Sequence, residues 1–257
     1  MAVEAETTED AALGGRLILR QPRRGHRFGH DAILLAAAAD ACPGETAVDL
    51  GAGVGTAGLA LAHRVPKLDV ALVEIDPVLA DLARENAVRN ALADRVRVAT
   101  LDVTASAQDF AGAGLPPEWA RHVLMNPPFN DAVRQNASPD ARRRHAHTAS
   151  SDTLIQWIGR AESLLGPSGT LTMIWRADGL ADVLATLGAR FGDIAILPVY
   201  PRPDAAAIRI LVRATKGSGA PLALLPGLTL NDVAGKPSAE AEEILRGGQN
   251  LNAFTRR

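Results

Sequence analysis

An Asn-Pro-Pro-Phe tetrapeptide at residues 126–129 carries the groups needed to hold a planar amine. The side-chain oxygen of Asn126 and the carbonyl oxygen of Pro127 can accept the two N–H bonds of such an amine and turn its lone pair toward a methyl donor. Proline stiffens the loop, so these acceptors are fixed before reaction. Phe129 offers a face on which a base can stack. The tetrapeptide therefore predicts methylation of an amine on a base or amide, with Asn126, Pro127 and Phe129 as catalytic residues.

A glycine-rich segment, residues 49–55 (DLGAGVG), predicts a turn that closes around a ligand. Its glycines stand at alternate positions, so the backbone can turn sharply and a ligand can lie against bare main chain. Dinucleotide-binding folds use similar loops, but with the G-x-G-x-x-G spacing that points a helix N-terminus at a pyrophosphate. Asp49 would repel a diphosphate, whereas it can accept hydrogen bonds from an ammonium group. The loop therefore favours a ligand with an amino-acid end.

Two further acidic residues follow the next two expected strands. Glu74 can accept both hydroxyl groups of a ribose, and Asp102 can accept a hydrogen bond from an adenine amine. The carboxyl ends of parallel strands meet at one edge of a sheet, so we expect these acids to face one ligand. An amino-acid end, a ribose and an adenine together describe S-adenosylmethionine. The predicted cofactor-binding residues are Asp49, Gly51, Gly53, Gly55, Glu74, Asp102 and Asn126.

Alternating apolar strands and helices position these residues. Such alternation predicts an α/β fold in which helices cover both faces of a mostly parallel sheet. The expected strands are 46–50, 69–75, 95–100, 122–125, 170–175, 194–199 and 207–212.

We expect one domain with short flexible tails at residues 1–12 and 251–257. The domain, residues 13–250, is expected to comprise an N-terminal extension on the substrate side, a core and a C-terminal extension. These three parts are residues 13–44, 45–214 and 215–250.

The overall composition excludes several classes of protein. Of the 257 residues, 47% are hydrophobic and one is a cysteine, and the formal net charge of the chain is -2. A disordered chain, a uniformly basic nucleic-acid coat, a disulfide scaffold and a multi-thiolate zinc site are therefore disfavoured. No apolar run approaches the roughly 20 residues that span a bilayer. We expect a cytoplasmic protein without a metal.

Residues 49–55, Glu74 and residues 126–129 together resemble the class I S-adenosylmethionine-dependent methyltransferases that act on amines. Residues 27–35 (RFGHDAILL) are similar to the segment before the first core strand in bacterial tRNA-Val (adenine-N(6))-methyltransferases. The resemblance covers about residues 14–250. It implies a Rossmann-like sheet of seven strands, mostly parallel with an antiparallel last strand. It also implies methylation of the exocyclic amine of adenine in RNA, with tRNA as the expected substrate.

Two basic segments flank the predicted acceptor loop. Residues 16–27 contain five arginines, and residues 134–147 contain four arginines and two histidines but only one acid. An RNA backbone beside an extruded base requires such phosphate contacts, although a solvated charged loop is the alternative interpretation. The predicted substrate-binding residues are Arg24, Arg27, Arg142, Arg143, Arg144 and His147.

Three alternatives compete with RNA methylation. Asn-Pro-Pro-aromatic also serves enzymes that methylate a protein glutamine amide or a DNA adenine. A catalytically silent S-adenosylmethionine-binding partner subunit is the alternative from another class, but it has no need for Asn126 and Phe129. A nicotinamide dehydrogenase is disfavoured by the glycine spacing and by the tetrapeptide.

Overall fold

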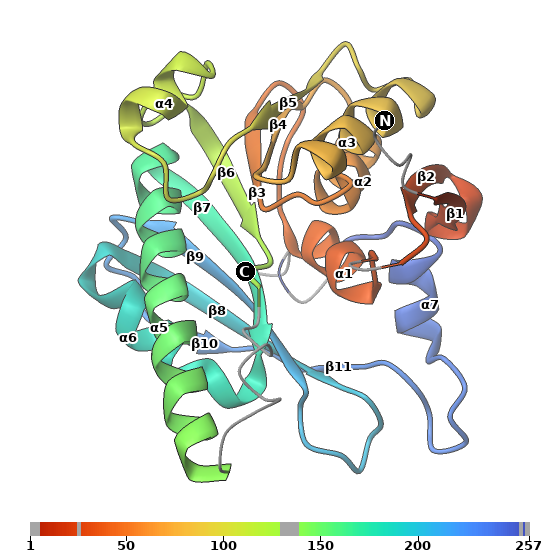
Figure 1. Cartoon of the computed structure of the whole chain (residues 1–257). Coiled ribbons are helices and arrows are strands. Elements are labelled where there is room, and N and C mark those ends of the chain that lie inside the picture. Colours follow the sequence, from red (N-terminus) through yellow and green to blue (C-terminus); the bar gives the residue numbers. More distant parts are fainter. Residues whose placement is uncertain (1–5, 25–26, 129–138, 252–253, 255–257) are drawn as a thin grey trace.

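A nine-stranded sheet forms the centre of the molecule (Figure 1). The structure is a computed structural model that describes residues 6–24, 27–128, 139–251 and 254, and for residues 139–151 it describes the backbone alone. The strands run in the order β10-β8-β9-β7-β6-β3-β4-β5, and β11 also pairs with β8. Their bounds are β3 (Thr46–Leu50), β4 (Asp69–Glu74), β5 (Val96–Thr100), β6 (Ala120–Met125), β7 (Leu165–Arg176), β8 (Phe191–Tyr200), β9 (Arg209–Lys216), β10 (Ala223–Leu224) and β11 (Leu228–Thr229).

The strand directions confirm the predicted α/β class. Strand β9 is antiparallel to its neighbours β7 and β8, and the other pairs in this sheet are parallel. Seven strands match the predicted sheet, and β10 and β11 extend it along β8. Each of these two has only two residues, which is too short for a periodic hydrophobic pattern to reveal.

Helices cover both faces of the sheet, as Figure 1 shows. One face carries α1 (His30–Ala38), α2 (Thr56–Arg64), α3 (Pro77–Arg89) and α7 (Ala239–Leu245), and the other carries α4 (Ala107–Gly112), α5 (Pro139–Leu164) and α6 (Leu180–Leu187). Short 3-10 turns occupy Leu13–Gly15, Ala177–Gly179 and Gly188–Arg190. No helix in the described part of the chain is both long and apolar enough to cross a membrane.

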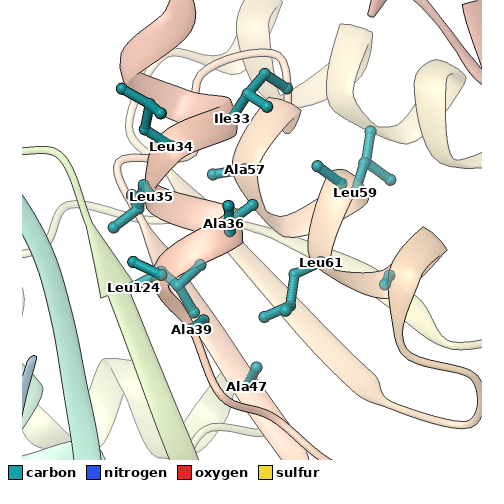
Figure 2. Packing of buried hydrophobic residues seen from close by; sticks show 14 of the residues in the cluster. Ile33, Leu34, Leu35, Ala36, Ala39, Ala47, Ala57, Leu59, Leu61 and Leu124 are labelled. Atoms are coloured by element: carbon teal, nitrogen blue, oxygen red, sulfur yellow. The ribbon is translucent and has the colours of Figure 1, made fainter. Parts of the chain in front are cut away.

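Two hydrophobic clusters hold the layers together. Figure 2 shows the first, in which Leu34 and Leu35 of α1 pack with Leu59 and Leu61 of α2 and with Leu124 of β6. All five are at most 1% exposed, and burial of one such side chain contributes about 1.5–3 kcal/mol. This packing fixes α1 and the start of α2 beside the carboxyl ends of the central strands.

Parts of the two predicted tails are ordered among the residues that the structure describes. Residues 7–12 form β1 (Thr7–Ala12), which pairs antiparallel with β2 (Leu17–Pro22). Their sequence, TTEDAA, lacks apolar alternation, and polar contacts such as the Glu9–Arg89 ion pair attach the strand to the domain. At the other end, Leu251 and Phe254 are buried at 1% and 2% exposure.

Helix α5 is longer than predicted. The sequence predicts a polar connection before a helix at about residue 152, whereas α5 begins at Pro139. Residues 139–151 are mostly basic, polar or small and have no large apolar residues at helical spacing, so hydrophobic periodicity did not reveal this part of the helix.

Candidate active site

A cavity of about 540 Å³ opens at the carboxyl ends of β3, β4 and β6. Its volume lies within the range of about 300–1,000 Å³ that is typical of small-molecule sites. The sequence-predicted residues in its wall are Arg27, Asp49, Gly51, Gly53, Glu74 and Asn126. The topology therefore brings together groups that are up to 99 positions apart in the chain.

Two glycines of the loop shape the floor of the cavity. Gly51 and Gly53 have φ angles of 68° and 57°, in the left-handed region that disfavours other residues. A Cβ atom on Gly51 would lie 2.4 Å from Cη2 of Trp157, so this indole packs directly on the backbone. A Cβ atom on Gly53 would meet no atom within 4 Å. Gly53 therefore presents open main chain to a ligand.

The Glu74 carboxylate is held by the backbone at the end of β4. Its Oε2 accepts a hydrogen bond from the Gly53 N–H at 2.7 Å, and Oε1 accepts one from the Asp76 N–H at 2.9 Å. The residue is 7% exposed. Each carboxylate oxygen has two lone pairs, so both oxygens keep capacity to accept a further bond from a ligand. The backbone thus fixes the carboxylate and leaves it able to hold two hydroxyl groups.

Asp49 lies deeper, with 2% exposure. Its Oδ2 accepts a hydrogen bond from the Gly58 N–H at 2.8 Å. The pKa of Asp49 is raised to about 7: burial is the main cause, the hydrogen bond from the Gly58 N–H opposes it, and the nearby charge of Glu74 adds a smaller rise. A bound cation would favour the ionised form of this carboxyl group.

Asn126 follows β6 directly and contributes an unsatisfied acceptor. Its side-chain oxygen is buried, and it has no hydrogen-bond partner among the described residues. An unpaired buried polar atom costs about 1–3 kcal/mol, so this oxygen favours a ligand that donates a hydrogen bond. Pro127 is buried behind it, and Pro128 lines the cavity. Phe129 lies outside the described residues.

Not every predicted cofactor residue reaches the cavity wall. Asp102 accepts hydrogen bonds from the backbone N–H and the hydroxyl of Thr104, at 2.7 and 2.8 Å, and it is absent from the wall. Its contact with an adenine stays a prediction. Gly55 is the N-cap of α2 and also lies outside the wall, with a φ of 89°.

The predicted substrate-binding residues fall into two groups. Arg27 lines the cavity, and its Nη2 donates to Oδ2 of Asp10 at 2.9 Å. Arg24 is exposed and lies outside the wall. The remaining four lie in the first half of α5, where the side chains are outside the described residues: Arg142, Arg143, Arg144 and His147.

Several wall residues were not predicted to bind a ligand. Phe28 comes from the segment that resembles relatives, and Trp157 is 9% exposed and belongs to the second hydrophobic cluster. Arg209 had no signal in the sequence, because only the sheet topology brings β9 to this edge. Elsewhere among the described residues, no group of three or more His, Cys, Asp or Glu side chains could hold a metal ion.

Comparisons with known proteins identify the relatives of this chain. The model of the methyltransferase small domain matches residues 29–197. A Porphyromonas gingivalis tRNA1(Val) (adenine(37)-N6)-methyltransferase is 33% identical over 161 residues, 61% of each chain. A Chlorobaculum tepidum release factor glutamine methyltransferase is 28% identical over 197 residues, 74% of this chain and 65% of that protein. The crystal structure of a predicted O-methyltransferase from Agrobacterium tumefaciens has a TM-score of 0.72 at 32% identity, covering 86% of this chain and 97% of that one.

Proposed function

This chain belongs to the methyltransferase small domain family, and we propose that it transfers a methyl group from S-adenosylmethionine to the exocyclic amine of an adenine in RNA. The observation that carries the proposal is the buried, unpaired side-chain oxygen of Asn126 at the wall of the cavity. The similarity to tRNA1(Val) (adenine(37)-N6)-methyltransferases makes tRNA the expected RNA. A tRNA substrate would place the enzyme in the cytoplasm.

The cavity fits S-adenosylmethionine by the chemistry of its donors and acceptors. Glu74 would accept the two ribose hydroxyl groups, and the bare backbone at Gly53 would let the ligand approach closely. Asp49 would face the positively charged amino-acid end, since a nearby cation favours its ionised form. When bound, the cofactor supplies an electrophilic methyl group.

The chain's own part in the reaction is to hold the acceptor amine. The Asn126 side-chain oxygen and the Pro127 carbonyl would each accept one N–H bond of the amine, which leaves its lone pair directed at the methyl donor. Both acceptors are fixed before the substrate arrives, because Pro127 is buried and constrains the loop. Positioning of the two reactants supplies much of the rate enhancement. The amine loses its proton readily once nitrogen is alkylated, so the mechanism requires no strong general base.

The test is to identify the acceptor directly. The purified protein is incubated with radiolabelled S-adenosylmethionine in three separate reactions. These contain total RNA, total DNA or total protein from cells that lack this gene. We expect label in the tRNA fraction, and mass spectrometry of its nucleosides should show N6-methyladenosine. Label in DNA or protein, with none in RNA, would contradict the proposal.

A protein glutamine amide is the second candidate acceptor. The similarity to a release factor glutamine methyltransferase supports it, because the same two acceptors can hold an amide NH2 group. The fractionation distinguishes the two acceptors, since methylglutamine would appear only in the protein fraction. A catalytically silent partner subunit would leave every fraction unlabelled while still binding the cofactor in calorimetry.

A further inference from the structure

Arg209, at the first position of β9, places a fixed cation in the wall of the same cavity as Asn126 and Pro128. Its Nε donates to Oδ2 of Asp31 at 2.9 Å, so α1 holds the guanidinium in one orientation. The two side chains are 29% and 28% exposed, which leaves the pair accessible from the cavity. A planar guanidinium with a fixed orientation matches the oxygens of an anion such as phosphate.

A second arginine lies directly opposite Arg209 on the neighbouring strand β7. Arg176 ends β7 and is the register partner of Arg209, so the two side chains lie on the same face. Nε of Arg176 is buried without a hydrogen-bond partner among the described residues, and its contact with Asp178 is 3.4 Å long. Like charges directly opposite one another destabilise a strand pair. An anion bound here would relieve that repulsion.

The strand order places Arg209 on the acceptor side of the cavity, with Arg176 next to it on β7 but outside the wall. Strand β9 is two strands from β6, which carries Asn126, and three from β3, which leads into the glycine loop. With neighbouring strands about 4.8 Å apart, the corresponding separations are about 10 and 14 Å. The carboxylates of Asp49 and Glu74 lie on β3 and β4. An anion therefore favours the β9 end and avoids the end with the two buried acids.

We propose that Arg209, with Arg176 beside it, binds a backbone phosphate next to the target nucleotide. The inference rests on the proposed function, because the RNA acceptor supplies the phosphate. Asp31 is then a positioning residue that orients Arg209. Arg27, which enters the same cavity from the N-terminal segment and is held by Asp10, provides positive charge on another part of the wall.

The experiment measures binding of total tRNA from cells that lack this gene, over a series of KCl concentrations. For Arg209→Gln we expect the slope of log K against log salt to fall by about 1, as for loss of one phosphate contact. The RNA Kd should rise about tenfold at low salt, and the cofactor Kd should stay within about twofold. Arg190→Gln is the matched control, because Arg190 also forms an arginine–carboxylate pair, with Glu162 at 2.7 Å, but it precedes β8 at the end of the strands opposite to Arg209. It should leave the salt slope unchanged.

Two results would overturn the inference. One is unchanged RNA affinity and salt slope in Arg209→Gln. The other is a weaker cofactor Kd with unchanged RNA binding, which would assign the anion to the carboxylate of the cofactor. Arg209→Lys keeps the charge and loses the fork, so it tests the inference if Arg209→Gln does not fold: RNA binding should weaken while the salt slope is retained. Wild-type methylation of the same tRNA is measured in parallel, so failure of the proposed function is seen separately.

Discussion

The two ends of the cavity differ in how far the chain satisfies its own polar groups. At the glycine-loop end, Glu74 accepts two backbone N–H bonds and Asp49 accepts one. At the other end, the buried oxygen of Asn126 has no partner among the described residues. The backbone therefore holds the carboxyl groups of the glycine-loop end in place before a ligand binds. Under the proposed function, the substrate would supply the donor that Asn126 lacks, which is where a catalyst benefits from unused acceptor capacity.

Charge follows the same division. The glycine-loop end carries two buried carboxyl groups, whereas Arg27 and Arg209 enter the wall from the N-terminal segment and from β9. A ligand with a cationic end would be drawn to the first, and an anionic backbone to the second. Under the proposed function, this difference would orient the cofactor and the RNA on opposite sides of Asn126.

The largest expected effect comes from the acceptor end, where the oxygen of Asn126 has no hydrogen-bond partner among the described residues. Asn126→Ala removes the side-chain acceptor, and loss of one preorganised group of this kind lowers kcat by about 10²–10³-fold. The cofactor Kd should stay within a few-fold, because Glu74 and the glycine loop remain. Single-turnover kinetics and calorimetry measure the two quantities. Asn231→Ala is the control, since Asn231 lies in the C-terminal extension, where its Nδ2 donates to the carbonyl of Pro201. Unchanged turnover in Asn126→Ala would remove Asn126 from the mechanism.

The next effect tests the packing of the glycine-loop end of the cavity. Gly51→Ala and Gly53→Ala both place a side chain at positive φ, which costs about 1–2 kcal/mol. Only the first also collides with Trp157, at 2.4 Å. Gly51→Ala should therefore lower the free energy of unfolding more than Gly53→Ala in urea titrations. Trp157→Phe, which shortens the ring, should recover part of the loss in the double variant. Equal losses in both glycine variants would show that the indole yields without cost.

A smaller effect is expected at Glu74. Glu74→Gln keeps the shape and one acceptor oxygen but loses the charge and one of the two acceptors, so the cofactor Kd should rise about tenfold in calorimetry. Glu85→Gln serves as the matched control, because Glu85 is an exposed acid of α3 that pairs with Arg20. An unchanged cofactor Kd in Glu74→Gln would exclude the ribose role of this carboxylate.

The sequence revealed the residues of the glycine-loop end better than those of the acceptor end, for a physical reason. Gly51, Gly53 and Glu74 belong to local strand-to-helix turns, where residue type and position in the chain report the conformation directly. Arg209 is near Asn126 only because β9 inserts between β7 and β8, a long-range pairing that leaves no local pattern. Strand β1 was missed for a different reason: a hairpin and polar contacts hold it, so it has no alternating apolar face.

The last predicted effect depends on pH and concerns the charge of Asp49, whose pKa is raised chiefly by burial to about 7 from an ordinary value of 3.8. The folded state therefore binds a proton that the unfolded chain has lost between about pH 4 and 7. The stability that comes from this protonation is fully present below that window and is lost as pH rises through it, with a slope of at most about 1.4 kcal/mol per pH unit.

Asp49→Asn should remove this contribution to the pH dependence, because asparagine keeps an acceptor for the Gly58 N–H but does not titrate. The difference in unfolding free energy between the variant and the wild type should thus shift in favour of the variant as pH rises from 4 to 7. Since a cation favours ionised Asp49, wild-type cofactor affinity should also rise across pH 6–8, and the variant should lack this rise. Urea titrations and calorimetry across the pH range measure both. A difference in stability that stays constant over this window would mean that Asp49 is already ionised in the folded protein, and that the glycine-loop end tolerates two buried negative charges.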